Sequence, residues 1–194
     1  MSGPDELFAA IAAGDSDTAR SLLAADPTLA SARNQSGLSA VIAAQYRHDA
    51  GMVDLLLAAG PELDVFDAAA VGDVDRLGTL LDADPSLVDA FAADGHFPLG
   101  LAAYFGRPRA VELLLERGAD VSAVARNRMR VQALHAAVAA RSREVVRLLL
   151  AAGADPNAEQ HGGWTPLMAA QQHGDDDIAA ELVAAGAHPG PPPA

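Results

Sequence analysis

The sequence contains no cysteine and no lysine, and only eight of its 194 residues are aromatic. The absence of cysteine excludes a disulfide framework, a thiolate nucleophile and a zinc–thiolate site. The absence of lysine excludes a Schiff base and a Walker A phosphate loop, since both need a lysine amine. Acidic residues number 26 against 13 arginines. The resulting net charge of −13 argues against general affinity for nucleic acid or anionic lipid.

The residues that are abundant favour helices. Alanine (45) and leucine (24) are strong helix formers, and 51% apolar with 20% charged residues is a globular composition. No apolar run approaches the roughly 18 residues of a membrane span, and the acidic start lacks the positive charge of a secretory signal. We therefore expect an all-α, cytoplasmic, monomeric protein without membrane contact. Heavy use of Ala, Arg, Gly and Pro without Lys indicates a bacterial source.

The sequence repeats itself at two scales. Residues 5–62 align without a gap on 63–120 at 21 identical positions, including Gly14 with Gly72 and Tyr46 with Tyr104. A shorter frame places a glycine twenty residues after each of three equivalent positions, Pro98, Ala133 and Pro166. Within each copy two apolar stripes at helical spacing flank a short break, and the second ends at a glycine suited to a helix C-cap. Each copy predicts two antiparallel helices joined by a tight turn.

The predicted inter-helix turns are unevenly spaced. They fall at Gly14, His48, Gly72, Gly106, Arg141 and Gly174. The differences between successive residue numbers are therefore 34, 24, 34, 35 and 33. The short step from His48 to Gly72 indicates that about ten residues are missing between the second and third units.

Four segments carry a family resemblance. They are LLLERGADV at 113–121, QALHAA at 132–137, LLLAAGADPNA at 148–158 and WTPLMAA at 164–170. Together they resemble the ankyrin repeat. The resemblance implies a solenoid of six stacked helix-turn-helix repeats with short β-turn fingers and a concave face that binds proteins. The short step implies that one finger is missing before the third unit.

The repeat frame also sets the expected domain organisation. We expect a single ankyrin repeat domain over 1–187, followed by a disordered proline-rich tail over 188–194. The approximate units are 5–35, 36–64, 65–93, 94–127, 128–160 and 161–187. Glu181 replaces a leucine found in the two preceding units, which predicts a polar outer face on the last unit.

No catalytic motif emerges. The chain has no Gly-x-Ser-x-Gly, no His-Glu-x-x-His and no calcium loop. Asp175 to Asp177 open a predicted helix, where carboxylates cap free amides. His135 occupies a position that is phenylalanine, isoleucine, glycine or methionine in the other units, which favours a structural role over a ligand role. We expect no enzyme activity, no metal and no cofactor.

The resemblance implies that partner contacts come from the finger tips and the exposed side of each first helix. Tyr, Trp, Arg and Met are frequent interface anchors because they combine large area with a directional handle. Two alternatives stay open: Trp164 could cover its own finger, and Phe105 could be partly buried. Phe8 and Phe66 are expected in the core. The predicted partner-binding residues are Gln35, Leu38, Tyr46, Arg47, His96, Tyr104, Phe105, Arg126, Arg128, Met129, Arg130, His161, Trp164, Gln172 and His173.

The arginines are concentrated in the middle of the chain. Residues 105–150 hold nine of the 13 arginines and four acids, a net charge of +5 between two acidic flanks. Arg126, Arg128 and Arg130 alternate in one predicted finger. They either balance acidic neighbours in solvent or receive an acidic partner segment or a phosphate. The leading hypothesis is a non-catalytic module that binds an unidentified protein. The alternative is binding of a phosphorylated ligand or nucleic acid by the arginine block, although the net charge makes nucleic acid binding unexpected.

Overall fold

The computed structural model describes residues 3–188, and the regular secondary structure in that range consists of short helices. It has no strand or sheet there, only isolated β-bridges between Arg33 and Ser39 and between Val124 and Gln132. This confirms the predicted all-α repeat fold. The helices are α1 (Gly3–Ala13), α2 (Ser16–Ala25), α3 (Ala40–Tyr46), α4 (Ala50–Ala58), α5 (Val65–Val71), α6 (Val74–Ala83), α7 (Pro98–Tyr104), α8 (Pro108–Glu116), α9 (Ala133–Ala139), α10 (Arg143–Ala151), α11 (Pro166–Gln172) and α12 (Asp176–Ala184).

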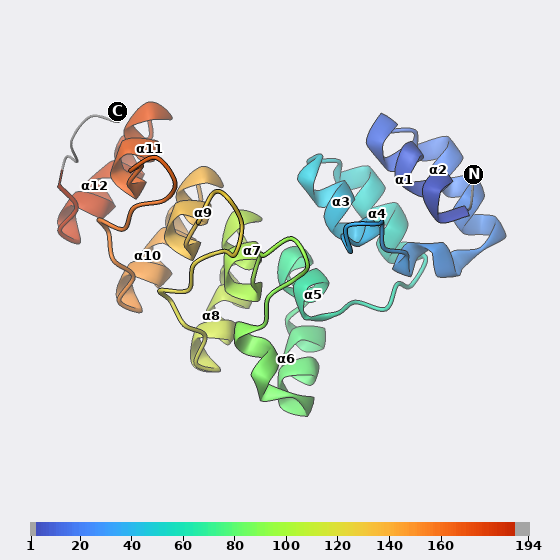
Figure 1. Cartoon of the computed structure of the whole chain (residues 1–194), viewed down its shortest axis with the longest axis horizontal. Helices are drawn as coiled ribbons and strands as arrows, with labels where there is room; N and C mark the ends of the chain where they lie inside the picture. Colours follow the sequence, from blue (N-terminus) through green and yellow to red (C-terminus); the bar gives the residue numbers. More distant parts are fainter. Residues whose placement is uncertain (1–2, 189–194) are drawn as a thin grey trace. The chain divides into compact units, whose positions relative to one another are not determined.

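The chain divides into two compact units, the first ending at Asp67 and the second beginning at Ala68. In the first unit, α1 packs on α3 and α2 on α4. In the second, α7, α9 and α11 pack in succession, as do α6, α8, α10 and α12 (Figure 1). Helices of seven to eleven residues are marginal alone in water, so their stability comes from this stacking.

Stacking buries one apolar stripe from each helix. The largest fully buried side chains are mostly leucines. They are Leu7, Ile11, Met52, Leu56, Leu77, Leu81, Leu99, Leu101, Leu114, Leu134, Leu149 and Leu167. All six predicted inter-helix turns contain a residue in the left-handed region, at φ between 54° and 81°. The turn positions read from the repeat frame are therefore confirmed.

Polar caps mark where the helices begin. The second helix of four pairs starts after an aspartate whose side chain accepts a backbone N–H, at Asp15, Asp49, Asp73 and Asp175. The Asp-Pro pairs at 26–27 and 84–85 open two matching 3-10 helices, Pro27–Ser31 and Pro85–Asp89. These short helices stand where the later units have a Gly-Ala-Asp turn. The duplication of 5–62 over 63–120 is thus visible in the structure.

The connection between α4 and α5 is short. Residues 59–64 join the helices directly and form no hairpin. The other inter-repeat connections each form a hairpin finger. The missing finger before the third unit, predicted from the short step between His48 and Gly72, is confirmed.

Three expectations need correction or restriction. Glu181 does not face outward: its carboxylate bonds Arg143 and Arg147 on the preceding α10, at 2.6 and 2.8 Å. The large apolar side chain exposed on α12 is Val183, at 55%. Phe8 and Phe66 are half-buried rather than core residues. Of the predicted tail, residues 189–194 lie outside the described residues.

Within residues 3–188 no helix is long and apolar enough to cross a membrane. The same part of the chain has no cluster of three or more His, Asp or Glu side chains that could hold a metal ion.

Candidate functional site

Four hairpin fingers share one turn geometry. In each, the N–H of the tip residue donates to a carbonyl three residues earlier, at 2.9 to 3.2 Å. The tip residues are Gly37, Gly95, Arg130 and Gly163, and all have positive φ. The β-bridge of the Gly37 finger joins Arg33 and Ser39, and that of the Arg130 finger joins Val124 and Gln132. The Arg130 finger is therefore two residues longer between its bridged positions.

Backbone hydrogen bonds tie the three fingers of the second unit together. The N–H of Arg126 donates to the carbonyl oxygen of Gly95 at 2.8 Å. The N–H of His161 donates to the carbonyl oxygen of Met129 at 3.0 Å. Within the central finger, the Asn127 side chain accepts the N–H of Met129 at 3.1 Å. The tips are therefore held by main-chain contacts and ordered before any partner binds.

Gly95 lies where two backbones approach closely. A Cβ atom on this residue would lie 2.5 Å from the carbonyl oxygen of Arg126 and 3.1 Å from its Cα. Its φ is +81°, a conformation that side chains disfavour. Both the backbone angle and the contact with the next finger therefore require glycine here.

Arg130 is the exception among the tip residues. Its φ is +53°, whereas the equivalent tips all carry glycine. A non-glycine residue in the left-handed region costs about 1 kcal/mol, and such strain gathers at functional sites. The repeat frame contains this signal, because each tip lies three residues before the proline position, but sequence reasoning missed it.

The structure separates the arginines of the middle segment into two groups. Three of them, on α10 and in the turn before it, are bonded within the fold: Arg141 contacts Asp175 at 3.2 Å, and Arg143 and Arg147 share Glu181. In the central finger, the Arg126 guanidinium lies 3.7 Å from the centroid of the Phe91 ring. The other two finger arginines, Arg128 and Arg130, are exposed. No acidic group of the described chain forms an ion pair with either of them.

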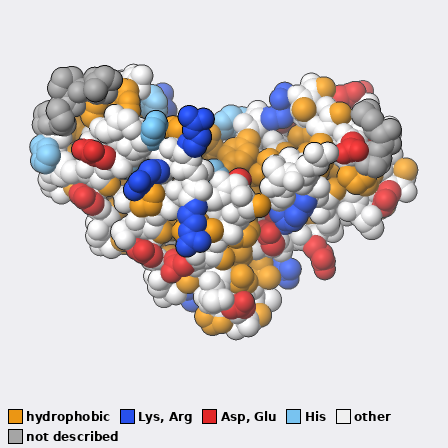
Figure 2. Space-filling view, in the orientation of Figure 1, with side chains coloured by type: hydrophobic (Ala, Val, Ile, Leu, Met, Phe, Trp, Pro, Cys, Tyr) orange, Lys and Arg blue, Asp and Glu red, His pale blue; other side chains and the backbone are white. Residues whose placement is uncertain are grey.

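Basic side chains are visible on the face drawn in Figure 2, over the segment between α8 and α9. This segment carries Arg126, Arg128 and Arg130. The predicted arginine block is thus not uniform. Arg141, Arg143 and Arg147 are bonded within the fold, whereas Arg128 and Arg130 are available to a partner.

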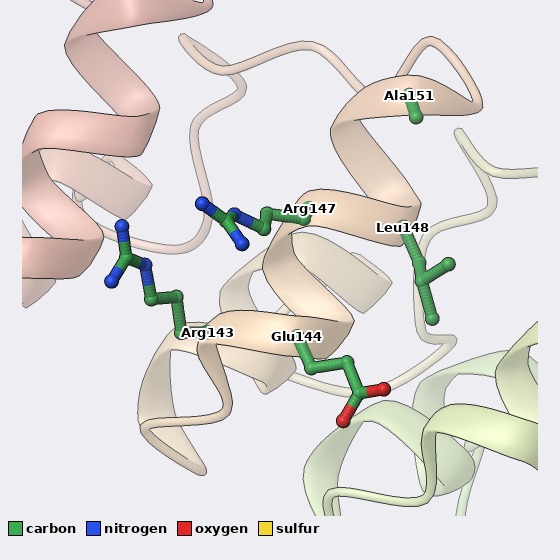
Figure 3. Close-up of a pocket in the computed structure, with 5 residues that line it drawn as sticks. All are labelled: Arg143, Glu144, Arg147, Leu148 and Ala151. Carbon is green, nitrogen blue, oxygen red and sulfur yellow. The ribbon is translucent and has the colours of Figure 1, made fainter.

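A hollow of about 630 Å³ lies beside α10 (Figure 3). Its lining comes from this one helix: Arg143, Glu144, Arg147, Leu148 and Ala151. Figure 3 shows Arg143 and Arg147 extending to one side of the helix and Leu148 to the other. Because both arginines are bonded to Glu181, the hollow offers no free cation and is not the candidate site.

Large exposed apolar side chains are few in the described chain. They are Tyr104 at 36%, Met129 at 53% and Val183 at 55%. Tyr104 ends α7, and its ring stacks edge-on against the half-buried Phe105 at a centroid distance of 5.0 Å. Two of the three, Tyr104 and Met129, are predicted partner residues.

Two other predicted anchors are less accessible. Tyr46 is half-buried and its hydroxyl oxygen is inaccessible to solvent. Trp164 is also half-buried, and its carbonyl oxygen lies 3.3 Å from Nε2 of His135. Burial lowers the pKa of His135, partly offset by this backbone contact, which suits a neutral imidazole in a structural role. Asp175 caps α12 through the N–H of Ile178, as predicted.

The remaining predicted residues lie mostly on the surface. Gln35, Arg47, His161, Gln172 and His173 are exposed, while Leu38 and His96 are partly buried. His96 lies beside the central finger, with Nε2 3.4 Å from the Asn127 side-chain nitrogen. Gln35, Leu38, Tyr46 and Arg47 belong to the first unit, and the others belong to the second.

A buried charged cluster in the first unit was missed. Asp67, at 2% exposure, accepts a hydrogen bond from the Ser39 hydroxyl and lies 3.0 Å from the Arg33 guanidinium. Asp64 binds the same guanidinium at 2.7 Å and caps α5. Burial, together with the Asp64 carboxylate, raises the pKa of Asp67 to about 6. The available signal was a lone acid within the apolar run VFDAAAV at 65–71.

Stacked short helix pairs, with hairpin fingers at the connections, define the class of helical repeat proteins. The family model described as "Ankyrin repeats (3 copies)" matches residues 65–160, and the family model described as "Ankyrin repeat" matches residues 162–191. The chain belongs to the ankyrin repeat family. Repeats of this family are generally protein–protein interaction modules.

Curated relatives are longer proteins that share this region. The chain is 39% identical over 121 residues to human neurogenic locus notch homolog protein 4, covering 62% of this chain and 6% of that protein. It is 39% identical over 97 residues to the mouse B-cell lymphoma 3 protein homolog, covering 50% and 21%. It is 31% identical over 173 residues to the E3 ubiquitin-protein ligase KEG of Arabidopsis thaliana, covering 84% and 9%. The chain thus spans no more than a quarter of the length of these relatives.

Proposed function

We propose that the chain is a non-catalytic protein-binding module. Its partner contacts the fingers of the second unit and the exposed ends of the first helices beside them. One observation carries the proposal: two of the three large exposed apolar side chains, Tyr104 and Met129, lie at positions that the family uses for partner contacts. Exposed aromatic and Met side chains on a rigid scaffold are typical of interface anchors.

The alternative, a nucleic acid or phosphorylated ligand held by the whole arginine block, receives less support. Three arginines of the block, Arg141, Arg143 and Arg147, are paired within the fold with Asp175 or Glu181. A phosphate backbone needs an extended row of free cations. Nucleic acid binding would predict a mobility shift with a short oligonucleotide at about 50 mM salt, and we expect none.

Removing the anchors should release the partner. We expect Tyr104→Ala combined with Met129→Ala to reduce recovery of a bound protein at least tenfold, since truncating two interface anchors costs more than about 1 kcal/mol each. The measurement is affinity purification from the native cell with quantitative mass spectrometry. Val183→Ala is the matched control, because it truncates an equally exposed apolar side chain on α12. Equal recovery with the double variant and the control would contradict the proposal.

A further inference from the structure

The tip of the central finger combines three features found together at no other described tip. It carries two exposed arginines, Arg128 and Arg130, and the exposed Met129 between them. It replaces the glycine of the other tips by an arginine in the left-handed region. Its backbone is tied to the finger on each side.

Arg130 stands where the other three tips have glycine. Glycine at position 130 would make the same turn without strain, as Gly37, Gly95 and Gly163 show. The Arg130 guanidinium has no acidic partner among the described residues, so no ion pair within the fold offsets the strain. Strained backbone conformations gather at functional sites, which makes the tip with its two free guanidinium groups a candidate for a contact outside the chain.

The chemistry of the tip identifies the kind of contact. Guanidinium groups bind carboxylates through paired, charge-assisted hydrogen bonds. Met129 adds a flexible apolar surface that adapts to different side chains. On the finger before this tip, the Asp94 carboxylate accepts the backbone N–H of His96 at 3.1 Å.

We infer that the 128–130 tip is a docking site for an acidic segment of the partner protein, with Arg128 and Arg130 binding its carboxylates and Met129 contacting an adjacent apolar side chain. The inference rests on the proposed protein-binding function and adds the chemistry of the partner. The rigid connection to the neighbouring fingers fixes where the two guanidinium groups are presented.

The structure offers a matched pair of variants. Arg130→Gly and Arg141→Gly each remove one arginine in the left-handed region, at φ +53° and +54°. Each removes one positive charge and substitutes the glycine found at the equivalent positions. Arg141, however, lies in an inter-helix turn and is bonded to Asp175. Only Arg130→Gly should affect the docking site, and it should leave the melting temperature unchanged or higher.

The test is selection of random twelve-residue peptides displayed on phage by the full chain. We expect Asp and Glu to be enriched several-fold over the input library, and this enrichment to disappear with Arg128→Ala/Arg130→Gly and persist with Arg141→Gly. A selected peptide, labelled with fluorescein, should bind about tenfold more weakly to Arg130→Gly than to Arg141→Gly. A control peptide with Gln and Asn in place of Glu and Asp should bind the wild-type chain no more tightly than the acidic peptide binds Arg130→Gly.

The other outcomes separate the two proposals. Selected peptides without acidic enrichment, sensitive to Tyr104→Ala and Met129→Ala only, would overturn the acidic docking site and leave the protein-binding function standing. Selection of no peptide at all would count against both. A fluorescein-labelled single-stranded oligonucleotide that bound more tightly than the peptides and lost affinity in Arg130→Gly would assign the tip to nucleic acid instead.

Discussion

Replacing Gly95 with alanine is expected to lower the free energy of unfolding by about 3 kcal/mol, combining backbone strain with a steric clash. The added Cβ would lie 2.5 Å from the Arg126 carbonyl oxygen, which is a backbone atom and cannot rotate away. Relief requires the two fingers to separate, and the hydrogen bond from Arg126 to Gly95 would then be lost. Urea unfolding measures the change, and a drop of about 6 to 12 °C in melting temperature should accompany it.

Gly118→Ala is the matched control for this prediction. Its φ of +85° is close to that of Gly95, but no atom lies within 4 Å of the Cβ position. We expect a loss of about 1 kcal/mol from backbone strain alone. Equal losses in both variants would show that the two fingers are not in close contact.

The second large effect is a pH dependence arising from Asp67. Its pKa is about 6 in the folded chain against 3.8 ordinarily, so the native state binds a proton that the unfolded state releases between these values. Asp67 therefore stabilises the fold most below pH 3.8, and this contribution is lost as the pH rises through 6. A shift of this size corresponds to roughly 3 kcal/mol.

The measurement compares the wild-type chain with Asp67→Asn by urea unfolding across this pH range. We expect the wild-type advantage in free energy of unfolding to shrink with rising pH. Two neighbouring variants should move the pH at which half of this advantage is lost, because they shift the pKa of Asp67 in opposite directions. Asp64→Asn removes a repelling carboxylate and should lower the pKa of Asp67, whereas Ser39→Ala removes a hydroxyl donor and should raise it. A difference that stays constant over this range would refute the assignment.

The repeat fold could be predicted because its signals are local. A glycine or a turn residue at a regular interval, and apolar stripes at helical spacing, determine where each short helix begins and ends. The short step between His48 and Gly72 was sufficient to predict the missing finger. The cap prediction failed at Glu181 because periodicity identifies a changed residue without telling which neighbouring unit its side chain faces.

The site was only partly accessible to sequence reasoning. The surface exposure of Met129 followed from the repeat frame, and the strain at Arg130 could have been read from it. The difference between Arg141, bonded to Asp175, and Arg130, which has no such partner, depends on contacts between residues about 34 positions apart. The same holds for Asp67 and Ser39, which meet only because the two segments fold together.

The bonds from Arg126 to Gly95 and from His161 to Met129 use main-chain atoms alone. The spacing between successive finger tips in the second unit therefore does not depend on most of the side chains at the tips. Side chains that point away from these bonds can be exchanged without moving the neighbouring fingers. Substitutions at one tip can therefore change which partner it recognises, while the spacing between the fingers stays the same.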